Sequence, residues 1–196
     1  MKERILVTGG TGYIGSHTVV ELQNSGYDVV IVDNLSNSSA DVVDNIEKVS
    51  GIRPAFEKLD CLDFEGMDKL FTKYPGIKGI IHFAASKAVG ESVQKPLLYY
   101  RNNLVSLINL LELMPKHGVE GIIFSSSCTV YGQPDVLPVT EEAPIKKAES
   151  PYGNTKQINE EIIRDTVASG SPINAIMLRY FNPIGAHPTA LIGELP

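Results

Sequence analysis

The sequence predicts an α/β fold, with helices on both faces of a doubly wound parallel sheet. Short runs rich in β-branched and apolar residues alternate along the chain with longer stretches of helical periodicity. The apolar runs do not alternate with polar residues, which is typical of strands buried on both faces of a parallel sheet. Right-handed crossovers between such strands distribute the helices over the two faces.

Each element is assigned from its residue pattern, in chain order. Strands are expected where the short apolar runs occur, at residues 3–9, 27–33, 53–60, 79–84, 121–127 and 173–181. Helices are expected between them, at residues 13–26, 39–51, 64–74, 94–118 and 150–169. The clearest helix start is at Ser150, a favourable N-cap, with Pro151 at the first helical position. The helix at 94–118 has apolar residues on more than one face, which indicates burial on both sides.

Composition limits the classes of function. The 196 residues, 43% of them hydrophobic, are enough for one globular domain with a core. The net charge of −6 argues against general binding to nucleic acid or anionic membranes. No apolar run approaches the ~20 residues of a membrane span, and the N-terminus is not typical of a signal peptide. Cys61 and Cys128 lack metal-ligand spacing and the four histidines are scattered, so we expect no metal site and a cytoplasmic location.

A glycine-rich loop connects the first expected strand to the first helix. VTGGTGYIGSH satisfies both Gly10-x-Gly12-x-x-Gly15 and Gly9-x-x-Gly12-x-x-Gly15. Such glycines let the backbone turn tightly and approach a pyrophosphate, whose charge is stabilised by the helix N-terminus. Asp33 ends the next strand, where an acid accepts hydrogen bonds from a ribose 2′-hydroxyl and repels a 2′-phosphate. Together they predict binding of NAD rather than NADP; the alternative is a glycine turn that only packs the helix on the strand.

The segment after the fourth expected strand lies at the point where a doubly wound sheet opens its ligand crevice. This segment, HFAASKAVGES, contains Lys87, which could meet phosphate charge or be an ordinary solvated lysine. His82 is expected to be a core or near-core histidine with its hydrogen bonds satisfied. The crevice is therefore predicted to lie between this segment and the glycine loop.

Three polar side chains are expected to converge beside the nicotinamide end of that crevice. The fifth expected strand ends in Ser127, so its carboxyl end faces the same side. Tyr152 and Lys156 are four residues apart on one face of the helix that starts at Ser150. A nearby positive charge favours the phenolate and lowers a tyrosine pKa from ~10. We predict that Tyr152 is a general base activated by Lys156; the alternative is an ordinary surface pair.

These segments resemble the extended short-chain dehydrogenase/reductase superfamily and, within it, the UDP-glucose 4-epimerase family. The resemblance extends over essentially the whole chain and is carried by TGGTGYIGSHT, DNLSNS, KAVGESVQKPLLYY, FSSSCTVYG, SPYGNTK and LRYFNPIGAHP. The glycine loop and the Tyr-x-x-x-Lys pair are shared by the superfamily, whereas KAVGES with the last two segments is specific. The chain departs from the family pattern at Ala85 and Ser86, where Gly-Leu is expected, and at Cys128, where Ala is usual.

The resemblance implies a reaction and a role for each site residue. The family interconverts UDP-galactose and UDP-glucose at sugar C4 through a 4-keto intermediate, with hydride passing to NAD and back. Tyr152 would remove the proton of the 4-hydroxyl, Lys156 would lower the Tyr152 pKa and hold the nicotinamide ribose, and Ser127 would hydrogen-bond the reacting oxygen. The positions that match NAD contacts are Gly9, Gly12, Tyr13, Ile14, Gly15, Asp33, Asn34, Leu35, Ser36, Asn37, Ser38, Asp60, Cys61, Phe83, Ala84, Ala85, Ser86, Lys87, Asn102, Tyr152, Lys156 and Phe181. Those that match substrate contacts are Ser127, Tyr152 and Asn182. From its residue type alone, Phe181 is expected to be a core residue.

The Pro- and Gly-rich residues after the last expected strand suggest a chain cut at a domain boundary, with a natural short protein as the alternative. We expect an NAD-binding Rossmann domain at 1–180 and the start of a truncated substrate-binding region at 181–196, because family members continue into a smaller C-terminal domain. Such a fragment, if folded, is expected to bind NAD with little or no epimerisation. The resemblance also implies a homodimer through the helices at 94–118 and 150–169, with burial inside the monomer as the alternative.

Two other functions are considered. Another nucleotide-sugar enzyme of the superfamily, such as a 4,6-dehydratase, needs an extra acid pair, typically in a Thr-Asp-Glu run after the fifth strand. The chain has Ser127-Cys128-Thr129 there, which disfavours a dehydratase. A non-catalytic NAD-binding module is the alternative from another class. The intact Ser127, Tyr152 and Lys156 argue against it for the parent protein, but it stays open for a fragment.

Overall fold

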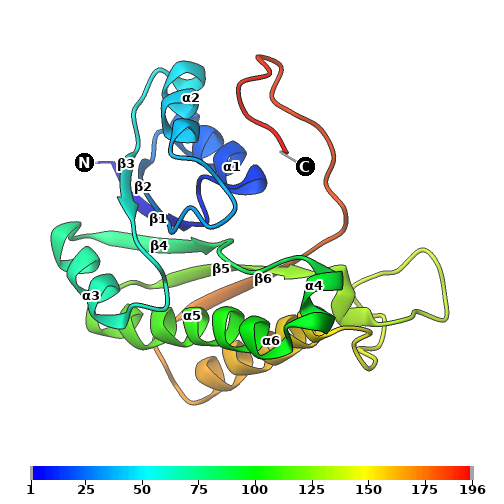
Figure 1. Ribbon diagram of the computed structural model, residues 1–196. Coiled ribbons are helices and arrows are strands. Elements are labelled where there is room, and N and C mark those ends of the chain that lie inside the picture. Colours follow the sequence, from blue (N-terminus) through cyan, green and yellow to red (C-terminus); the bar gives the residue numbers. More distant parts are fainter. Residues whose placement is uncertain (1, 195–196) are drawn as a thin grey trace.

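The structure, a computed structural model, describes residues 2–194 as one six-stranded sheet with helices on both faces (Figure 1). The strand order is β3-β2-β1-β4-β5-β6, and the five pairings are parallel. The strands are β1 (Arg4–Thr8), β2 (Asp28–Asp33), β3 (Ala55–Lys58), β4 (Ile77–His82), β5 (Gly121–Ser127) and β6 (Asn174–Tyr180). This confirms the predicted doubly wound parallel sheet, with the change of direction between β1 and β4.

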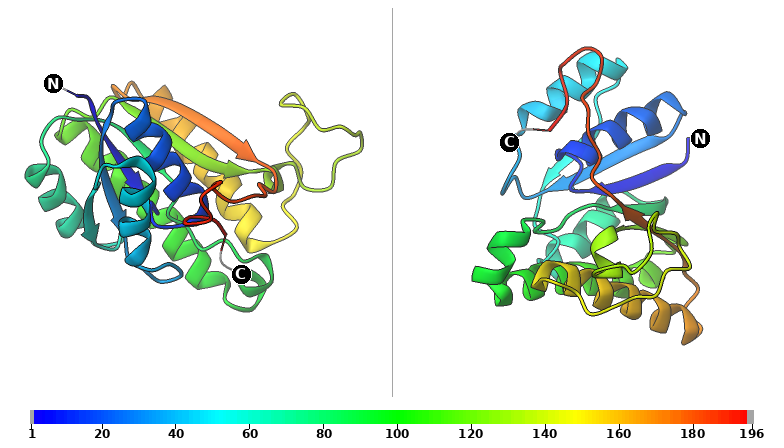
Figure 2. Two further views of the ribbon diagram at one scale, coloured as in Figure 1. Left: turned by 90° about the horizontal axis from the view of Figure 1, so that it is seen from above. Right: turned by 90° about the vertical axis from the view of Figure 1, so that its right-hand side faces the viewer.

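Two sets of helices cover the two faces of the sheet (Figures 1 and 2). On one face lie α1 (Tyr13–Asn24) and α2 (Asp41–Ser50), whose Val19 and Ile46 pack against the sheet. The other face is covered by α3 (Phe64–Lys73), α5 (Pro96–Lys116) and α6 (Pro151–Ala168). Two short helices, α4 (Val89–Gln94) and the 3-10 helix η1 (Cys128–Tyr131), follow the carboxyl ends of β4 and β5. None of the described helices is long and apolar enough to cross a membrane.

Two predictions about the elements are wrong. The helix expected at 94–118 is interrupted at Lys95, where the backbone leaves the helical region, and α5 begins with Pro96 at its first position. The expectation that all strands are buried on both faces fails at the sheet edges. In β6, Ile176 is 57% exposed and Leu178 is 39% exposed, because no described helix covers that strand on the α1 side. In the edge strand β3 every residue is partly or fully exposed.

After β6 the chain returns to the first helices instead of continuing outward. Residues 181–194 run from the end of β6 back toward α1 and α2 (Figures 1 and 2). Ile192 is 4% exposed and joins the core cluster that contains Val19 and Ile46. Within the segment expected to start a substrate-binding region, Ile192 thus packs on the sheet domain, and the domain boundary at residue 180 stays a prediction. Residues 195–196 lie outside the described residues.

Candidate active site

The glycine loop packs tightly against the strands on both sides of it. Gly9 has a φ of +68°, and its N–H donates to the Val32 carbonyl of β2 at 2.8 Å. A Cβ at Gly9 would lie 2.7 Å from the Ala84 nitrogen that follows β4. A Cβ at Gly15 would overlap the Gly9 carbonyl oxygen, so α1 can start this close to the loop only with glycine there. These glycines therefore do pack the helix closely against the strands, as the alternative interpretation of the loop proposed.

Packing does not account for the N-terminus of α1. Its N-cap is Gly12, which makes no side-chain capping hydrogen bond, and the first turn contains no acidic residue. The first backbone N–H groups of a helix have no partner within the helix. The helix dipole adds partial positive charge at the same place. This end of α1 is therefore suited to a phosphate group at the carboxyl edge of the sheet.

Asp33 is held at that edge by donors from the protein. One carboxylate oxygen accepts the Thr11 N–H at 3.2 Å, and the other accepts the Leu35 N–H at 2.9 Å and the Ser38 hydroxyl at 3.2 Å. Leu35 adopts a left-handed backbone, with a φ of 63°, to make this turn. The acid thus ties the glycine loop to residues 34–38, which the sequence placed at the same site.

The next turn, after β3, joins this cluster through Asp60. Its carboxylate accepts the Asn34 side-chain amide at 2.9 Å and the Leu62 N–H at 2.9 Å. Cys61 beside it is buried, and burial raises the pKa of its thiol to about 12. Cys61 is therefore a neutral thiol and not a nucleophile at ordinary pH.

The segment after β4 is linked to α5 and α6 through two asparagines. Asn102 donates to the Ser86 hydroxyl at 3.0 Å, and the Ser86 N–H donates to the Asn103 side-chain oxygen at 2.8 Å. Asn103, which is buried, also donates to the Thr155 hydroxyl of α6 at 3.0 Å. Lys87 is exposed and lies 3.3 Å from the Glu194 carboxylate, a solvated pair that contributes little to stability.

The three predicted catalytic side chains are brought together at the carboxyl end of β5. The Ser127 oxygen accepts the Thr129 N–H and hydroxyl at 3.2 and 3.0 Å, and the Ser127 hydroxyl lies close enough to Tyr152 to lower the pKa of its phenol. Lys156 is buried, with its ammonium 2.7 Å from the Ser125 carbonyl oxygen and 5.8 Å from the centre of the Tyr152 ring. Burial lowers the pKa of Lys156 to about 8. A hydroxyl, a phenol and an amine thus lie beside one another where the crevice opens.

The pKa of Tyr152 is raised, not lowered as the sequence suggested. Burial raises the Tyr152 pKa, the neighbouring Ser127 hydroxyl lowers it in part, and the electrostatic effect of the nearby Cys128 side chain raises it again. Lys156 is not among the causes, because its ammonium is directed at the Ser125 carbonyl. In this structure the group that stabilises the phenolate is therefore Ser127.

His82 is confirmed as a core histidine. It is 2% exposed, and its ring nitrogen Nδ1 lies 2.7 Å from the Thr8 hydroxyl. Burial, followed by the charge of Lys156, lowers its pKa to about 3. The imidazole is neutral and holds β4 to β1 under the site.

Two predicted residues lie outside this cluster. Phe181 is 58% exposed, so the expectation of core packing from its residue type is wrong. It follows the end of β6, where the chain has left the sheet and no described element covers it. Asn182 is likewise exposed. Among the described residues there is also no group of three or more His, Cys, Asp or Glu side chains that could hold a metal ion.

The sequence reasoning missed a buried ion cluster one turn along α6 from Lys156. Glu160 is fully buried, and its carboxylate accepts hydrogen bonds from Ser126, Arg164 and Arg179. The available signal was spacing, since Glu160 is four residues after Lys156 and eight after Tyr152. A single sequence does not show that an acid at this spacing is buried.

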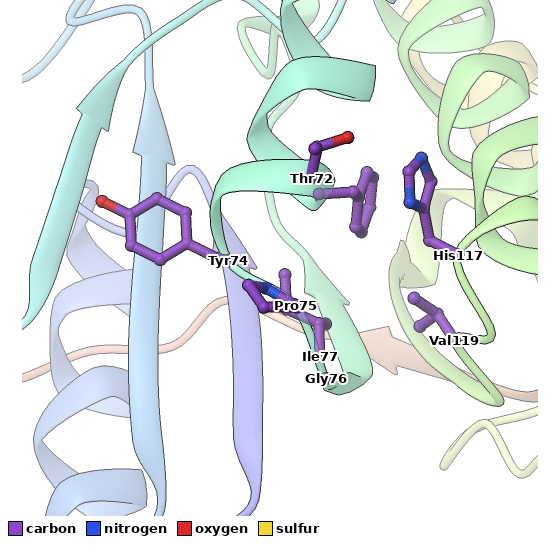
Figure 3. A pocket seen from close by; sticks show the side chains of 8 residues that line it. Thr72, Tyr74, Pro75, Gly76, Ile77, His117 and Val119 are labelled. Carbon is purple, nitrogen blue, oxygen red and sulfur yellow. The ribbon is translucent and has the colours of Figure 1, made fainter.

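A cavity of about 280 Å³ lies at the amino ends of the strands and is not part of the site. It is lined by residues that precede or begin β4 and β5, among them Pro75, Ile77 and Val119. Figure 3 shows His117 and Val119 on one side of it, opposite Thr72. The amino ends of the strands meet there, whereas the candidate site lies at their carboxyl ends.

Comparison with known proteins decides the family. Residues 5–194 match the model of the NAD dependent epimerase/dehydratase family. The chain belongs to this family. Among curated members, UDP-glucose 4-epimerase of Dictyostelium discoideum is 52% identical over 194 residues, and the Homo sapiens enzyme is 49% identical over 202 residues. These alignments cover 99% and 100% of this chain.

Solved structures of the family agree with the fold. The UDP-glucose-4-epimerase from Stenotrophomonas maltophila, with bound NAD and formylated UDP-arabinopyranose, is 48% identical with a TM-score of 0.95. The enzyme from Bifidobacterium longum, in complex with NAD+ and UDP, has the same identity and TM-score. They cover 99% and 97% of this chain, but each alignment takes in only 57% of the solved chain. The chain likewise spans about 56% of the length of the Dictyostelium relative.

Proposed function

We propose that this chain carries the NAD site and the acid–base residues of a UDP-glucose 4-epimerase, an isomerase that interconverts UDP-galactose and UDP-glucose at sugar C4. The observation that carries the proposal is the convergence of Ser127, Tyr152 and buried Lys156 at the carboxyl ends of the strands, where the Lys156 ammonium lies 5.8 Å from the centre of the Tyr152 ring. Membership of the epimerase/dehydratase family supports it. So does the identity of about 50% to enzymes of that name. A cytoplasmic location remains a prediction.

The described residues fit NAD. The uncapped N-terminus of α1, with the amides of Tyr13 and Ile14, would hold the pyrophosphate. Asp33 would accept hydrogen bonds from the adenosine ribose and disfavour a 2′-phosphate. Residues 34–38, Asp60, Cys61, the segment Phe83–Lys87, Asn102 and Phe181 are proposed to line the rest of the cofactor. Bound NAD would supply the acceptor and then the donor of the hydride at sugar C4.

The side chains of this chain would manage the proton. Tyr152 takes the proton of the 4-hydroxyl onto its phenol oxygen as the hydride leaves C4, and gives it back when the hydride returns to the other face of the 4-keto sugar. Ser127 hydrogen-bonds the same sugar oxygen and the phenol. Lys156 would hold the nicotinamide ribose, and Asn182 would contact the sugar nucleotide. A second proposal, that the chain is a non-catalytic NAD-binding module, makes no use of Ser127 or Tyr152.

The exposure of the substrate side suggests how these 196 residues behave by themselves. Phe181 is more than half exposed and Asn182 follows it, so water has access to the side where the sugar nucleotide would bind. Binding energy from remote parts of a substrate is what orients the reacting group. We therefore propose that this chain binds NAD and catalyses little or no epimerisation without the further length that its relatives have.

The test compares cofactor binding and turnover in two proteins. Calorimetry on the 196-residue chain should show binding of NAD and much weaker binding of NADP. A hybrid in which residues 1–194 replace the matching part of the Bacillus subtilis relative, which is 52% identical, should convert UDP-galactose to UDP-glucose. In that hybrid Tyr152→Phe should reduce kcat by on the order of 10²–10⁴.

The outcomes separate the candidate functions. A hybrid that binds NAD but does not turn over, beside an active parent enzyme, would favour the binding module. Turnover that survives Tyr152→Phe would remove the role proposed for the phenol. Equal binding of NAD and NADP would remove the role proposed for Asp33.

A homodimer through α5 and α6 is part of the proposal. One side of α5 is buried in the monomer, but Leu97, Leu98, Val105 and Ile108 are exposed. A shallow cavity between the two helices is lined by Ile108 and Ile162. Such an exposed apolar strip is typical of an interface with a second protein surface.

A further inference from the structure

Three consecutive serines at the end of β5 lie beside three residues of α6 that are four apart, and two of the three pairs are hydrogen-bonded. The pairs are the Ser127 hydroxyl with Tyr152, the Ser125 carbonyl with Lys156 at 2.7 Å, and the Ser126 hydroxyl with Glu160 at 2.6 Å. Residues at such spacing lie along one face of a helix. The first two pairs contain the proposed catalytic groups, and the third contains none of them.

The pair of Ser126 and Glu160 differs from the other two pairs because several donors from different elements hold its charged, buried side chain. Glu160 and Ser126 are both buried. Arg179 of β6 donates to the Glu160 carboxylate through Nε at 3.0 Å and Nη2 at 2.8 Å, and Arg164 donates through Nη2 at 2.6 Å. Arg179 also donates to the Tyr131 hydroxyl of η1 at 2.9 Å. A bidentate guanidinium–carboxylate pair has a narrow range of geometries, so this cluster fixes α6 relative to both β5 and β6.

The other polar contacts of this part of α6 lead elsewhere. Asn154 donates to the Tyr100 hydroxyl, Thr155 accepts from Asn103, and Asn159 donates to the Asn103 carbonyl. Those partners belong to α5, so these bonds fix the position of α6 on α5. Gln157 donates to the Val130 carbonyl of η1 at 2.8 Å and to the Lys146 carbonyl at 2.5 Å, which holds α6 to the loop after β5 and not to β5 itself. Ser126, in contrast, lies between Ser125, whose carbonyl binds Lys156, and Ser127, which lies beside Tyr152.

We infer that Glu160, held by Arg179, is a positioning residue that fixes α6 on the end of β5 and so keeps Tyr152 beside Ser127. The inference rests on the proposed role of Tyr152 as the base. Glu160 itself does not contact that phenol and would take no part in proton transfer. Its contribution acts through Ser126 and through the one-residue offset between Ser126 and Ser127.

If Glu160 positions Tyr152, its removal should raise the Tyr152 pKa. If Glu160 acts only through its negative charge, its removal should lower the Tyr152 pKa. Removal of a negative charge from the neighbourhood lowers the pKa of a tyrosine, because the phenolate is repelled less. Movement of Ser127 away from the phenol raises the Tyr152 pKa, because the nearby Ser127 hydroxyl stabilises the phenolate. The other ionisable groups near the phenol are Cys128, Lys156 and Tyr99 of α5, and they stay the same in the variants below.

The experiment is a titration of Tyr152 by NMR in the 196-residue chain labelled with ¹³C at tyrosine Cζ, without cofactor or sugar. The Tyr152 signal is assigned by its loss in Tyr152→Phe. In Glu160→Gln and in Ser126→Ala the signal should titrate at higher pH than in the wild type. Ser126→Ala changes no charge and leaves the arginine pairs intact, so it decides the question alone if Glu160→Gln does not fold.

A matched control separates positioning from loss of stability. Glu57 accepts hydrogen bonds from Lys73 and Tyr74 at 2.6 Å each, far from the site. Glu57→Gln should lower stability and leave the Tyr152 titration unchanged. A downward shift in Glu160→Gln, or no shift in Ser126→Ala, would overturn the inference. Neither result bears on NAD binding or epimerisation, so the proposed function is judged separately.

Discussion

At Gly15 the addition of a single methyl group should affect both stability and cofactor binding. An alanine Cβ there would overlap the backbone of Gly9 and lie 2.9 Å from the Gly10 Cα, and a backbone cannot move as a flexible side chain can. We predict that Gly15→Ala lowers the free energy of unfolding by about 1–3 kcal/mol and abolishes NAD binding. Chemical denaturation and calorimetry measure the two effects.

Gly90 in α4 is the matched control, because a Cβ there has no heavy atom within 4 Å. Gly90→Ala should leave both quantities unchanged or raise stability slightly. Unchanged NAD binding in a folded Gly15→Ala protein would contradict the proposed position of the pyrophosphate.

The buried amine of Lys156 should make the stability of the protein depend on pH. Its pKa is about 8 in the folded protein against 10.5 for an unperturbed lysine. Between these values the unfolded chain holds more protons than the folded one, so the contribution of Lys156 to stability rises with pH. Below about pH 8 the cost of burying the charge is present in full. The free energy of unfolding of the wild type relative to Lys156→Met should therefore increase from pH 8 to pH 10, as followed by urea denaturation.

Both proteins contain the same other titrating groups, which cancel in this difference. A difference that stays constant over this range would show that Lys156 is not buried as a charge. A difference that falls would mean that the folded state binds the proton more tightly than the unfolded chain.

At the scale of elements, the sequence predicts which residues meet at the site, because this follows from the order of strands and helices. It does not predict the direction or burial of single side chains, because these depend on distant residues. Ser127, Tyr152 and Lys156 come together because the carboxyl ends of parallel strands meet at one edge, a rule that a sequence pattern carries. The pKa of Tyr152 depends instead on where one ammonium points, and Lys156 points at the Ser125 carbonyl. Glu160 was missed because its burial depends on Arg179, nineteen residues further along.

The break before α5 and the exposed face of β6 differ in the same way. The break at Lys95 had a local signal in Pro96, which is favourable at a helix start. The exposed face of β6 had none, since exposure depends on which elements cover a strand and not on the residues in it.

The exposed strip of α5 gives a prediction about assembly. Ile108 is 37% exposed and lies in the shallow cavity beside Ile162 of α6. If a second copy covers this strip, Ile108→Glu should convert a dimer to a monomer in sedimentation velocity experiments, since a buried unpaired carboxylate is costly. Ile52→Glu, at an isoleucine before β3 that is 41% exposed, should leave the sedimentation coefficient unchanged. A wild-type chain that sediments as a monomer at high concentration would rule the interface out for this chain.

At the scale of the whole molecule, the return of residues 181–194 to α1 should contribute to stability. Ile192 is 4% exposed in the cluster of Val19 and Ile46. Ile192→Ala should lower the free energy of unfolding by about 2–5 kcal/mol, the usual cost of such a core truncation. Leu191→Ala, at a residue 37% exposed, should change it by no more than about 0.5 kcal/mol. Equal effects of the two substitutions in urea denaturation would mean that the segment does not dock in solution.

The same docking adds a late step to folding as the protein is made. A growing chain leaves the ribosome from its N-terminus, and β1, at the centre of the sheet, must wait for β4 before both of its neighbours exist. The α1 side of the sheet waits longer, because Ile192 completes a cluster whose other members lie between Val7 and Ile81. Until that residue emerges, the cluster lacks one of its buried side chains, and exposed apolar surface on a nascent chain is what chaperones bind.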